Sequence, residues 1–138
     1  MADPKLVKGP LKTFLTRSGL YVQGQAKERA PVDTGRLRNS IATKVEEPRA
    51  LIGTNLSYAP WVEFGSRPHW PPLAAMQPWA RRHGFPAGRR GAFLVARRIA
   101  KKGTKARLFL TKGLAASTNQ ITRYLEMMAR EMEGRWGR

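Results

Sequence analysis

Cysteine is absent from the chain, and histidine and acidic residues are scarce. Without cysteine there is no disulfide scaffold, no cysteine nucleophile and no thiolate zinc site. The two histidines, His69 and His83, are far apart in the sequence, and neither has the i, i+4 partner or the neighbouring carboxylate of a metal or catalytic site. The nine acidic residues are scattered, which disfavours a paired-carboxylate hydrolase. We therefore expect no enzyme and no cofactor.

Long hydrophobic runs are also missing. No stretch approaches the roughly 18 apolar residues of a transmembrane helix, and the opening residues Met1–Lys5 lack the apolar core of a signal peptide. We expect no membrane partner, and a protein that is cytoplasmic or part of a particle assembled in the cytoplasm. The 138 residues fit a single domain (1–138), and a hydrophobic content of 41% is too high for a disordered polycation.

Positive charge dominates the composition, with 26 Lys and Arg against nine Asp and Glu, a formal net charge of +17. Half of the basic residues lie between Glu63 and Glu126, where no acidic residue occurs. Such charges repel one another unless they spread over a surface or meet an acidic partner. The segment is either a solvated basic face or a contact surface for phosphate or acidic protein, and net charge alone does not separate these. The candidate contact residues are Arg81, Arg82, Arg89, Arg90, Arg97, Arg98, Lys101, Lys102, Lys105 and Arg107.

Hydrophobic periodicity predicts more helices than strands. The expected helices cover residues 11–29, 57–64, 73–82, 92–102 and 112–135. A further short helix contains Leu37 and Ile41, with Asp33 or Thr34 as its cap. Residues 42–53 predict a hairpin around a turn at 46–49. The fold class is therefore α+β: a small central antiparallel sheet packed by a long N-terminal helix and a long C-terminal helix, with shorter helices between.

Two of these helices predict which side chains are buried. The apolar side of the helix over 92–102 comprises Phe93, Leu94, Ala96, Ile99 and Ala100. The apolar stripe of the last helix comprises Leu114, Ile121, Leu125, Met128 and Met132. Residues 108–110 read as a short extended piece before that helix.

Glu63 and the tryptophans each allow two interpretations. Glu63 is either a half-buried carboxylate paired with Arg36 or Arg38, or the polar side of a short amphipathic turn. Trp61, Trp70 and Trp79 recur at a spacing of nine and either stack on bases or pack a core or subunit interface.

Three ordered segments carry a more specific pattern. Residues 30–41 read Ala-Pro-Val-Asp-Thr-Gly-Arg-Leu-Arg-Asn-Ser-Ile, and residues 53–69 contain Gly-Thr-Asn, Tyr-Ala and Val-Glu-Phe-Gly-Ser-Arg-Pro-His in that order. Residues 92–110 form an arginine-rich segment that ends Leu-Phe-Leu. Together they resemble a family of small tailed-phage proteins, encoded among the head–tail joining genes of long-tailed phages and their prophages. Ser66 and Leu108 are small departures from its pattern. The matching family positions are Pro31, Asp33, Thr34, Gly35, Leu37, Tyr58, Glu63, Phe64 and Gly65.

The resemblance implies a virion structural protein of the phage neck or tail top, a tail-completion or head–tail joining protein. Related proteins act as rings, commonly six-fold. The expected partners are other copies of the chain in a hexameric ring, neighbouring neck, connector and tail-tube proteins, and genomic DNA passing through the lumen. The expected location is the virion, and the host cytoplasm during assembly. Residues 66–91 are the expected mobile segment, which would become ordered on assembly.

A standalone nucleic-acid-binding protein is the alternative, because the positive charge would also suit that role. No helix-turn-helix, zinc finger or aromatic RNA-binding signature occurs in the sequence, so this alternative depends on charge alone.

Overall fold

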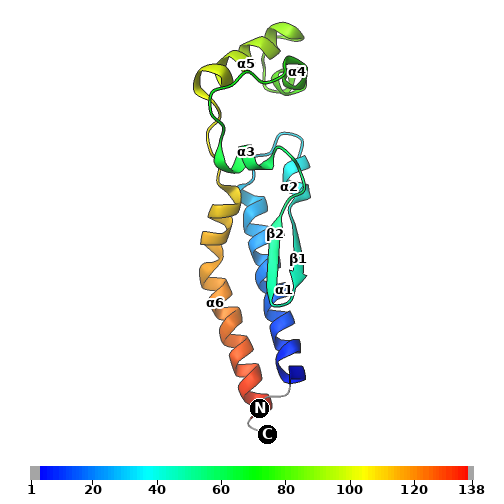
Figure 1. Ribbon diagram of the computed structural model, residues 1–138, viewed down its shortest axis with the longest axis vertical. Helices are drawn as coiled ribbons and strands as arrows, with labels where there is room; N and C mark the ends of the chain where they lie inside the picture. Colours follow the sequence, from blue (N-terminus) through cyan, green and yellow to red (C-terminus); the bar gives the residue numbers. More distant parts are fainter. Residues whose placement is uncertain (1–3, 137–138) are drawn as a thin grey trace.

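The computed structural model describes residues 4–136, so residues 1–3, on which the expectation about a signal peptide partly depends, lie outside it. In chain order the elements are α1 (Pro4–Arg29), α2 (Arg36–Ser40), β1 (Ala42–Glu46), β2 (Arg49–Gly53), α3 (Ala59–Phe64), α4 (Leu73–Arg82), α5 (Arg89–Lys102) and α6 (Phe109–Trp136). The fold is α+β, as predicted. Figure 1 shows an elongated molecule in which α1 and α6 run antiparallel as a stalk, with the hairpin along α1. Helices α4 and α5 form a lobe at the far end, and α2 and α3 lie at the junction between stalk and lobe.

Helices α1 and α6 pack through small residues. Gly113 lies so close to α1 that an added Cβ would be 2.8 Å from the backbone nitrogen of Ala26. One turn further along, Ser117 is fully buried and its hydroxyl donates a hydrogen bond to the Gly113 carbonyl at 2.7 Å. Tyr21 and Tyr124 then meet edge to face, with ring centroids 6.5 Å apart. The stalk therefore depends on close helix approach at one end and aromatic contact nearer the other.

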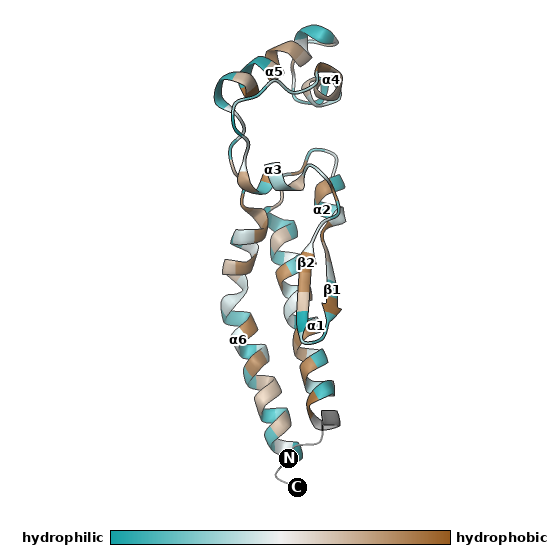
Figure 2. Ribbon diagram, viewed as in Figure 1, coloured by the Kyte–Doolittle hydropathy of each residue, from teal (hydrophilic) through white to brown (hydrophobic). Residues whose placement is uncertain are grey.

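The predicted apolar stripe of the last helix is only partly confirmed, because Ile121, Met128 and Met132 are half-buried but the other two members face outward. Leu114 and Leu125 are 54% and 47% exposed, whereas Phe109, Gly113 and Ser117 are buried. The distance between packed helices depends on the side chains at the contact, and the small residues of α6 allow the closest approach to α1. That contact turns larger side chains outward, and Figure 2 shows apolar and polar residues interspersed along the whole of α6.

The predicted hairpin is confirmed, and it packs on α1. Its strands are antiparallel, with Ala42 opposite Gly53 and Glu46 opposite Arg49. The Thr43 hydroxyl donates to the Gly19 carbonyl at 3.1 Å, and a Cβ at Gly19 would lie 2.5 Å from the Thr43 methyl carbon. Gly19, which weakens the helical pattern in the sequence, thus provides the space that the hairpin occupies. Helix α1 itself begins at Pro4, earlier than the predicted residue 11, and continues through Pro10.

The main core lies at the junction, where the end of α1, α2, α3 and the start of α6 meet. Its buried members are Ala26, Ala30, Leu37, Ile41, Ala59 and Phe109. The predicted extended piece over 108–110 is wrong, because Leu108 has a positive φ of 52° and α6 begins directly after it. This sharp turn places Phe109 in the core.

The lobe contains α4 and α5, whose buried contacts use Ala80, Ala92, Val95 and Ala96. The predicted boundaries of α4 are confirmed, with Pro78 inside the helix, and α5 begins three residues before the predicted start. Residues 66–91 therefore contain α4 and the first residues of α5, and their mobility stays a prediction.

Candidate assembly interface

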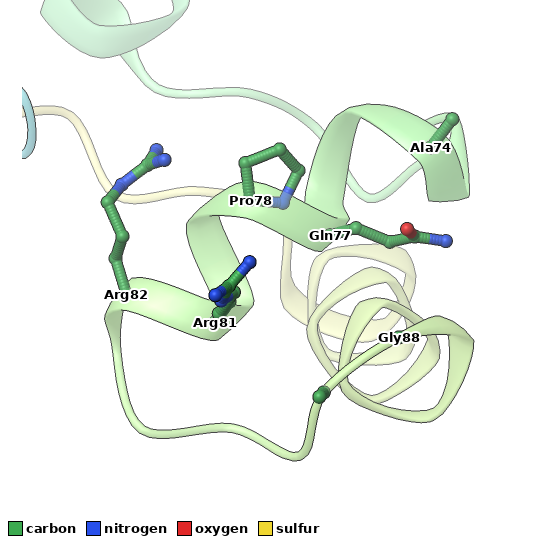
Figure 3. Close-up of a pocket in the computed structure, with 7 residues that line it drawn as sticks. Ala74, Gln77, Pro78, Arg81, Arg82 and Gly88 are labelled. Atoms are coloured by element: carbon green, nitrogen blue, oxygen red, sulfur yellow. The ribbon is translucent and has the colours of Figure 1, made fainter.

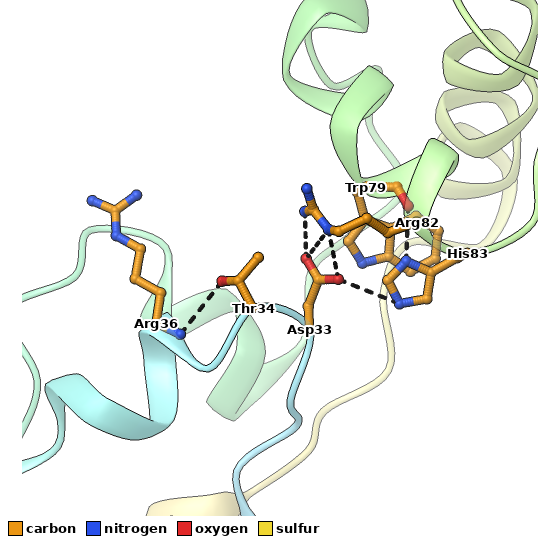
Figure 4. Close-up of polar contacts among 6 residues, drawn as sticks. All are labelled: Asp33, Thr34, Arg36, Trp79, Arg82 and His83. Atoms are coloured by element: carbon orange, nitrogen blue, oxygen red, sulfur yellow. Dashed lines mark hydrogen bonds and ion pairs between the residues drawn. The ribbon is translucent and has the colours of Figure 1, made fainter.

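The residues of the first family motif lie at the junction, and two of them have roles other than those predicted. Leu37 is buried in the core, while Thr34 is exposed. The predicted cap of α2 is confirmed only in part, because the N-cap position itself is Gly35, with a φ of 85° and no side-chain cap hydrogen bond. Thr34 accepts a long hydrogen bond of 3.4 Å from the Arg36 N–H. The Asp33 carboxylate points away from α2 toward the lobe (Figure 4).

Glu63 in the second motif caps α6 rather than pairing with an arginine. Its side chain is 3% exposed, and its carboxylate accepts hydrogen bonds from the N–H groups of Leu110 and Thr111, both at 2.9 Å, and from the Thr111 hydroxyl at 2.6 Å. The first N–H groups of a helix have no partner within it, and the helix dipole favours a negative charge there. The predicted pairing with Arg36 or Arg38 is therefore wrong. The buried carboxylate of Glu63 needs hydrogen-bond donors, and the start of α6 supplies them in place of an arginine.

Two glycines hold the chain segments that connect junction and lobe close together. Gly65 and Gly103 have φ values of 76° and 69°, and a Cβ on Gly103 would lie 2.1 Å from the Ser66 carbonyl oxygen. Ser66 and Thr104 exchange backbone hydrogen bonds at 3.1 and 3.2 Å. Only glycine adopts this backbone conformation without strain and leaves room for the opposing segment. This geometry explains why position 65 of the family pattern is a glycine.

A polar contact, here called the Asp33–Arg82 clasp, also links junction and lobe. The Arg82 guanidinium binds both carboxylate oxygens of Asp33, with its Nε 2.9 Å from Oδ1, and His83 Nε2 lies 3.7 Å from the same oxygen (Figure 4). His83 stacks on Trp79 at 3.9 Å and donates from Nδ1 to the Trp79 carbonyl. The hydrogen bonds and charge of Arg82 lower the pKa of the Asp33 carboxyl.

The structure gathers most of the candidate contact residues in the lobe. All ten are exposed, eight of them on α4 and α5, with Lys105 and Arg107 on the segment leading to α6. Within residues 4–136, Arg82 is the only one of the ten that forms an ion pair. Two aromatic residues at family positions are also exposed: Tyr58, directly before α3, and Phe64, its last residue.

Two apolar residues of α5 face outward, contrary to the prediction from the sequence. Phe93 and Leu94, both on the predicted apolar side of α5, are 47% and 40% exposed. Of that predicted side, Ala96 is buried, and it is joined in the buried face by Gly91, Ala92 and Val95. The two outward residues each precede an exposed arginine by four residues, Arg97 and Arg98, and such pairs share a helix face. A helical projection would have shown this arrangement.

The tryptophans do not form the core either. Trp61, Trp70 and Trp79 are each exposed, and Trp70 lies against Phe93 with ring centroids 5.9 Å apart. They are therefore accessible to a partner, as either a stacking or an interface role requires.

One open cavity of about 600 Å³ lies in the lobe between α4 and the loop before α5 (Figure 3). It is lined by Ala74, Gln77, Pro78, Arg81, Arg82, Ala87 and Gly88. The lining holds cations and an amide but no carboxylate or nucleophile.

Within residues 4–136, no group of three or more His, Asp or Glu side chains is placed to hold a metal ion. None of the helices in that range combines the length and hydropathy needed to cross a membrane.

Residues 5–65 match the family model described as "Bacteriophage HK97-gp10, putative tail-component". The matched part runs from α1 through α2, the hairpin and α3, and ends at Gly65 where the segment leading to the lobe begins. No curated protein and no solved structure matches the chain. The resemblance in the sequence is thus confirmed over residues 5–65, which match the HK97-gp10-like family of phage tail components.

Proposed function

We propose that this protein is a non-enzymatic structural component of the phage neck or tail top, which helps to complete the tail and join it to the capsid connector. The observation that carries the proposal is the family match over residues 5–65. The matched residues include most of those that form the junction, among them Leu37 in its core and Glu63, which caps the start of α6. The family pattern therefore corresponds to the part of the fold that holds stalk and lobe together.

The proposed form is a ring of identical copies, a hexamer, that contacts neck, connector and tail-tube proteins. A closed ring needs two different complementary faces on each copy. The chain offers exposed apolar side chains on separate elements, with Trp61 and Phe64 on α3 and Leu114 and Leu125 on α6. Aromatic side chains are frequent anchors of protein interfaces. The protein would reside in the virion, or in the host cytoplasm during assembly, and genomic DNA would pass through the lumen.

The test is a phage or prophage in which the gene is disrupted, with complementation by the wild-type gene. We expect lysates that contain filled heads and separate tails, counted by electron microscopy, and a large loss of infectious particles. Complementation with the wild type restores joined particles. Infectious particles with normally joined tails in the disrupted lysate would refute the proposal. Electron microscopy of the purified protein, alone and on isolated tails, tests the ring.

A standalone DNA-binding protein is the second candidate, and the observation that favours it is the exposed, unpaired charge of the lobe. It predicts tight binding to duplex DNA with a log–log salt slope of about one unit per phosphate contacted. A gel-shift titration at two salt concentrations measures this slope. Weak binding that disappears at moderate salt argues against a dedicated DNA-binding role.

A further inference from the structure

The outward side of α5 combines positive charge with apolar surface. Its central residues, here called the α5 face, are Arg90, Phe93, Leu94, Arg97, Arg98 and Lys101, all of them exposed. On a helix, residues three or four apart are neighbours, so Phe93 adjoins Arg90 and Arg97, and Leu94 adjoins Arg90, Arg97 and Arg98. The two apolar side chains therefore lie among the cations rather than at their edge.

The cations of the α5 face have no acidic partner within the described structure. The ion pairs of residues 4–136 involve neither Arg90, Arg97, Arg98 nor Lys101. No acidic residue occurs in the sequence between Glu63 and Glu126, so none lies on the lobe segment itself. A partner with negative charge would therefore gain several charge-assisted hydrogen bonds without displacing an internal one.

The apolar part of the α5 face extends beyond the helix. The Trp70 ring is 61% exposed and lies 5.9 Å from the Phe93 ring, so Trp70, Phe93 and Leu94 present apolar surface from two chain segments. The His69 N–H donates to the Ile99 carbonyl at 3.4 Å, which attaches the Trp70 segment to α5. An apolar centre with a charged rim is the usual anatomy of a protein–protein interface, in which buried aromatic residues act as anchors.

Duplex DNA would use only part of this surface. Phosphates are bound by arginine and lysine, and apolar contacts serve either the thymine methyl group in the major groove or wedges in a kinked minor groove. Phe93 and Leu94 project on either side of Arg90 and Arg97, where a phosphate backbone would leave them unmatched. An acidic protein segment with its own apolar residues would match both parts of the surface.

We propose that the α5 face is the docking surface for an acidic amphipathic segment of another protein, with Glu or Asp side chains around a small apolar centre. The inference rests on the proposed assembly role and specifies the chemistry of one partner. Phe93, Leu94 and Trp70 would contact the apolar residues of the partner. The surrounding cations would orient the partner and select acidic segments over neutral or basic ones. Because α5 is already a formed helix of 14 residues, the spacing of these side chains along its backbone is set before the partner binds.

The test uses the full chain and three fluorescent probes in anisotropy titrations at about 150 mM salt, where surface charges are screened beyond roughly 8 Å. The first probe is a helical peptide of Glu and Leu with the leucines on one side. The second replaces every Leu by Ser, and the third is a random-sequence DNA duplex of similar length. We expect the Glu–Leu peptide to bind at least about tenfold more tightly than the Glu–Ser peptide, the size of effect that a buried anchor produces.

Two double variants separate the parts of the surface. Phe93→Ser with Leu94→Ser, and Arg97→Gln with Lys101→Gln, should each weaken Glu–Leu peptide binding by about tenfold or more. The matched controls on α6, Leu114→Ser with Leu125→Ser and Arg123→Gln with Arg130→Gln, should change it less than about twofold. All substituted side chains are exposed, and circular dichroism spectra check that each variant is folded.

Three results would overturn the inference: no peptide binding, equal binding of the two peptides, or tighter binding of the duplex with no effect of the Phe93 and Leu94 substitutions. The last result would identify the lobe as a DNA contact. None of these outcomes depends on particle assembly, so the inference can fail while the disrupted phage still shows unjoined tails. Conversely, peptide binding can persist in a protein that proves dispensable for joining.

Discussion

Glu63 shows how a single buried charge is accommodated without a cation. Its carboxylate reaches from α3 to the first turn of α6, where it accepts three hydrogen bonds. The residue before α6 is Leu108, whose side chain has no acceptor with which to cap the helix. Glu63 therefore supplies in three dimensions the capping group that the adjacent sequence lacks.

Replacing Glu63 by Ala should lower the free energy of unfolding by about 1–3 kcal/mol, because the N–H groups of Leu110 and Thr111 at the start of α6 lose their acceptor. Glu63→Gln should cost less, since an amide oxygen can still accept one of these bonds. Urea unfolding followed by circular dichroism measures both. Glu126→Gln, an exposed carboxylate on α6, is the control and should change stability little. A loss in Glu63→Ala no larger than in this control would contradict the capping role.

At the scale of elements, glycines determine how closely the long helices and the hairpin approach. Gly113 contacts the α1 backbone at Ala26, whereas Gly24, on the same helix as Ala26, has no neighbouring atom within 4 Å of an added Cβ. Gly113 thus allows the close approach of α6 to α1, whereas Gly24 makes no such contact. From the sequence alone, both residues would only lower helix propensity. The difference gives a matched pair of substitutions.

Gly113→Ala should destabilise the protein by about 1–3 kcal/mol, because the added methyl group would force α1 and α6 apart. Gly24→Ala should stabilise it by about 0.5–1 kcal/mol through higher helix propensity alone. Thermal unfolding of both variants and of the wild type measures the two changes in stability, which should have opposite signs. Stabilisation in both variants would mean that the helices do not approach as closely as the structure indicates.

At the scale of the whole molecule, few contacts join the lobe to the rest of the structure. Helices α4 and α5 pack chiefly on each other. The lobe connects to the rest through the paired segments at Ser66 and Thr104 and through the Asp33–Arg82 clasp. The orientation of the lobe therefore depends on a small number of polar groups.

The clasp predicts a pH dependence of stability. Arg82 lowers the pKa of Asp33 in the folded protein from its ordinary value of 3.8, so the contact stabilises the fold above that pH, and the contribution is lost as the pH falls through the lowered pKa. Asp33→Asn should therefore be less stable than the wild type near neutral pH, and this difference should shrink well below pH 3.8. Urea unfolding at several pH values measures the difference.

A control for the clasp is Glu47→Gln, an exposed carboxyl at the hairpin turn. Its difference from the wild type should stay small at every pH. A difference between Asp33→Asn and the wild type that is constant across the acid range would argue against an ionised Asp33 in the contact.

The concentrated charge of the lobe predicts a salt dependence. Raising salt from about 10 mM to about 150 mM shortens the screening length from roughly 30 Å to roughly 8 Å and should raise the melting temperature, because repulsion among lobe cations weakens. Arg90→Gln with Arg98→Gln should raise the melting temperature at low salt and reduce this dependence. The same double change at Arg123 and Arg130, on α6 near Glu126, should do neither. Equal behaviour of the two double variants would contradict localised repulsion.

Local pattern was sufficient to predict the helices, the hairpin and the α+β class, because hydrophobic period, proline position and turn residues act over a few neighbours. The hairpin over 42–53 and the exact span of α4 are examples. The family pattern around Asp33 and Glu63 was likewise readable in the sequence. The residues to which these carboxylates bind were not, because Arg82 is 49 positions from Asp33 and Thr111 is 48 from Glu63.

The sequence by itself determined the net charge of +17, its concentration in one acid-free segment, the element types and the family resemblance. Only the tertiary structure decided which side of each helix is buried. In α6 the small residues Gly113 and Ser117 face α1, and in α5 the alanines face α4, so the larger Leu114, Leu125, Phe93 and Leu94 face outward. Close backbone approach favours small side chains at a helix contact, and hydrophobic periodicity does not record that preference. The basic segment therefore exposes apolar side chains among its cations, which its composition did not reveal.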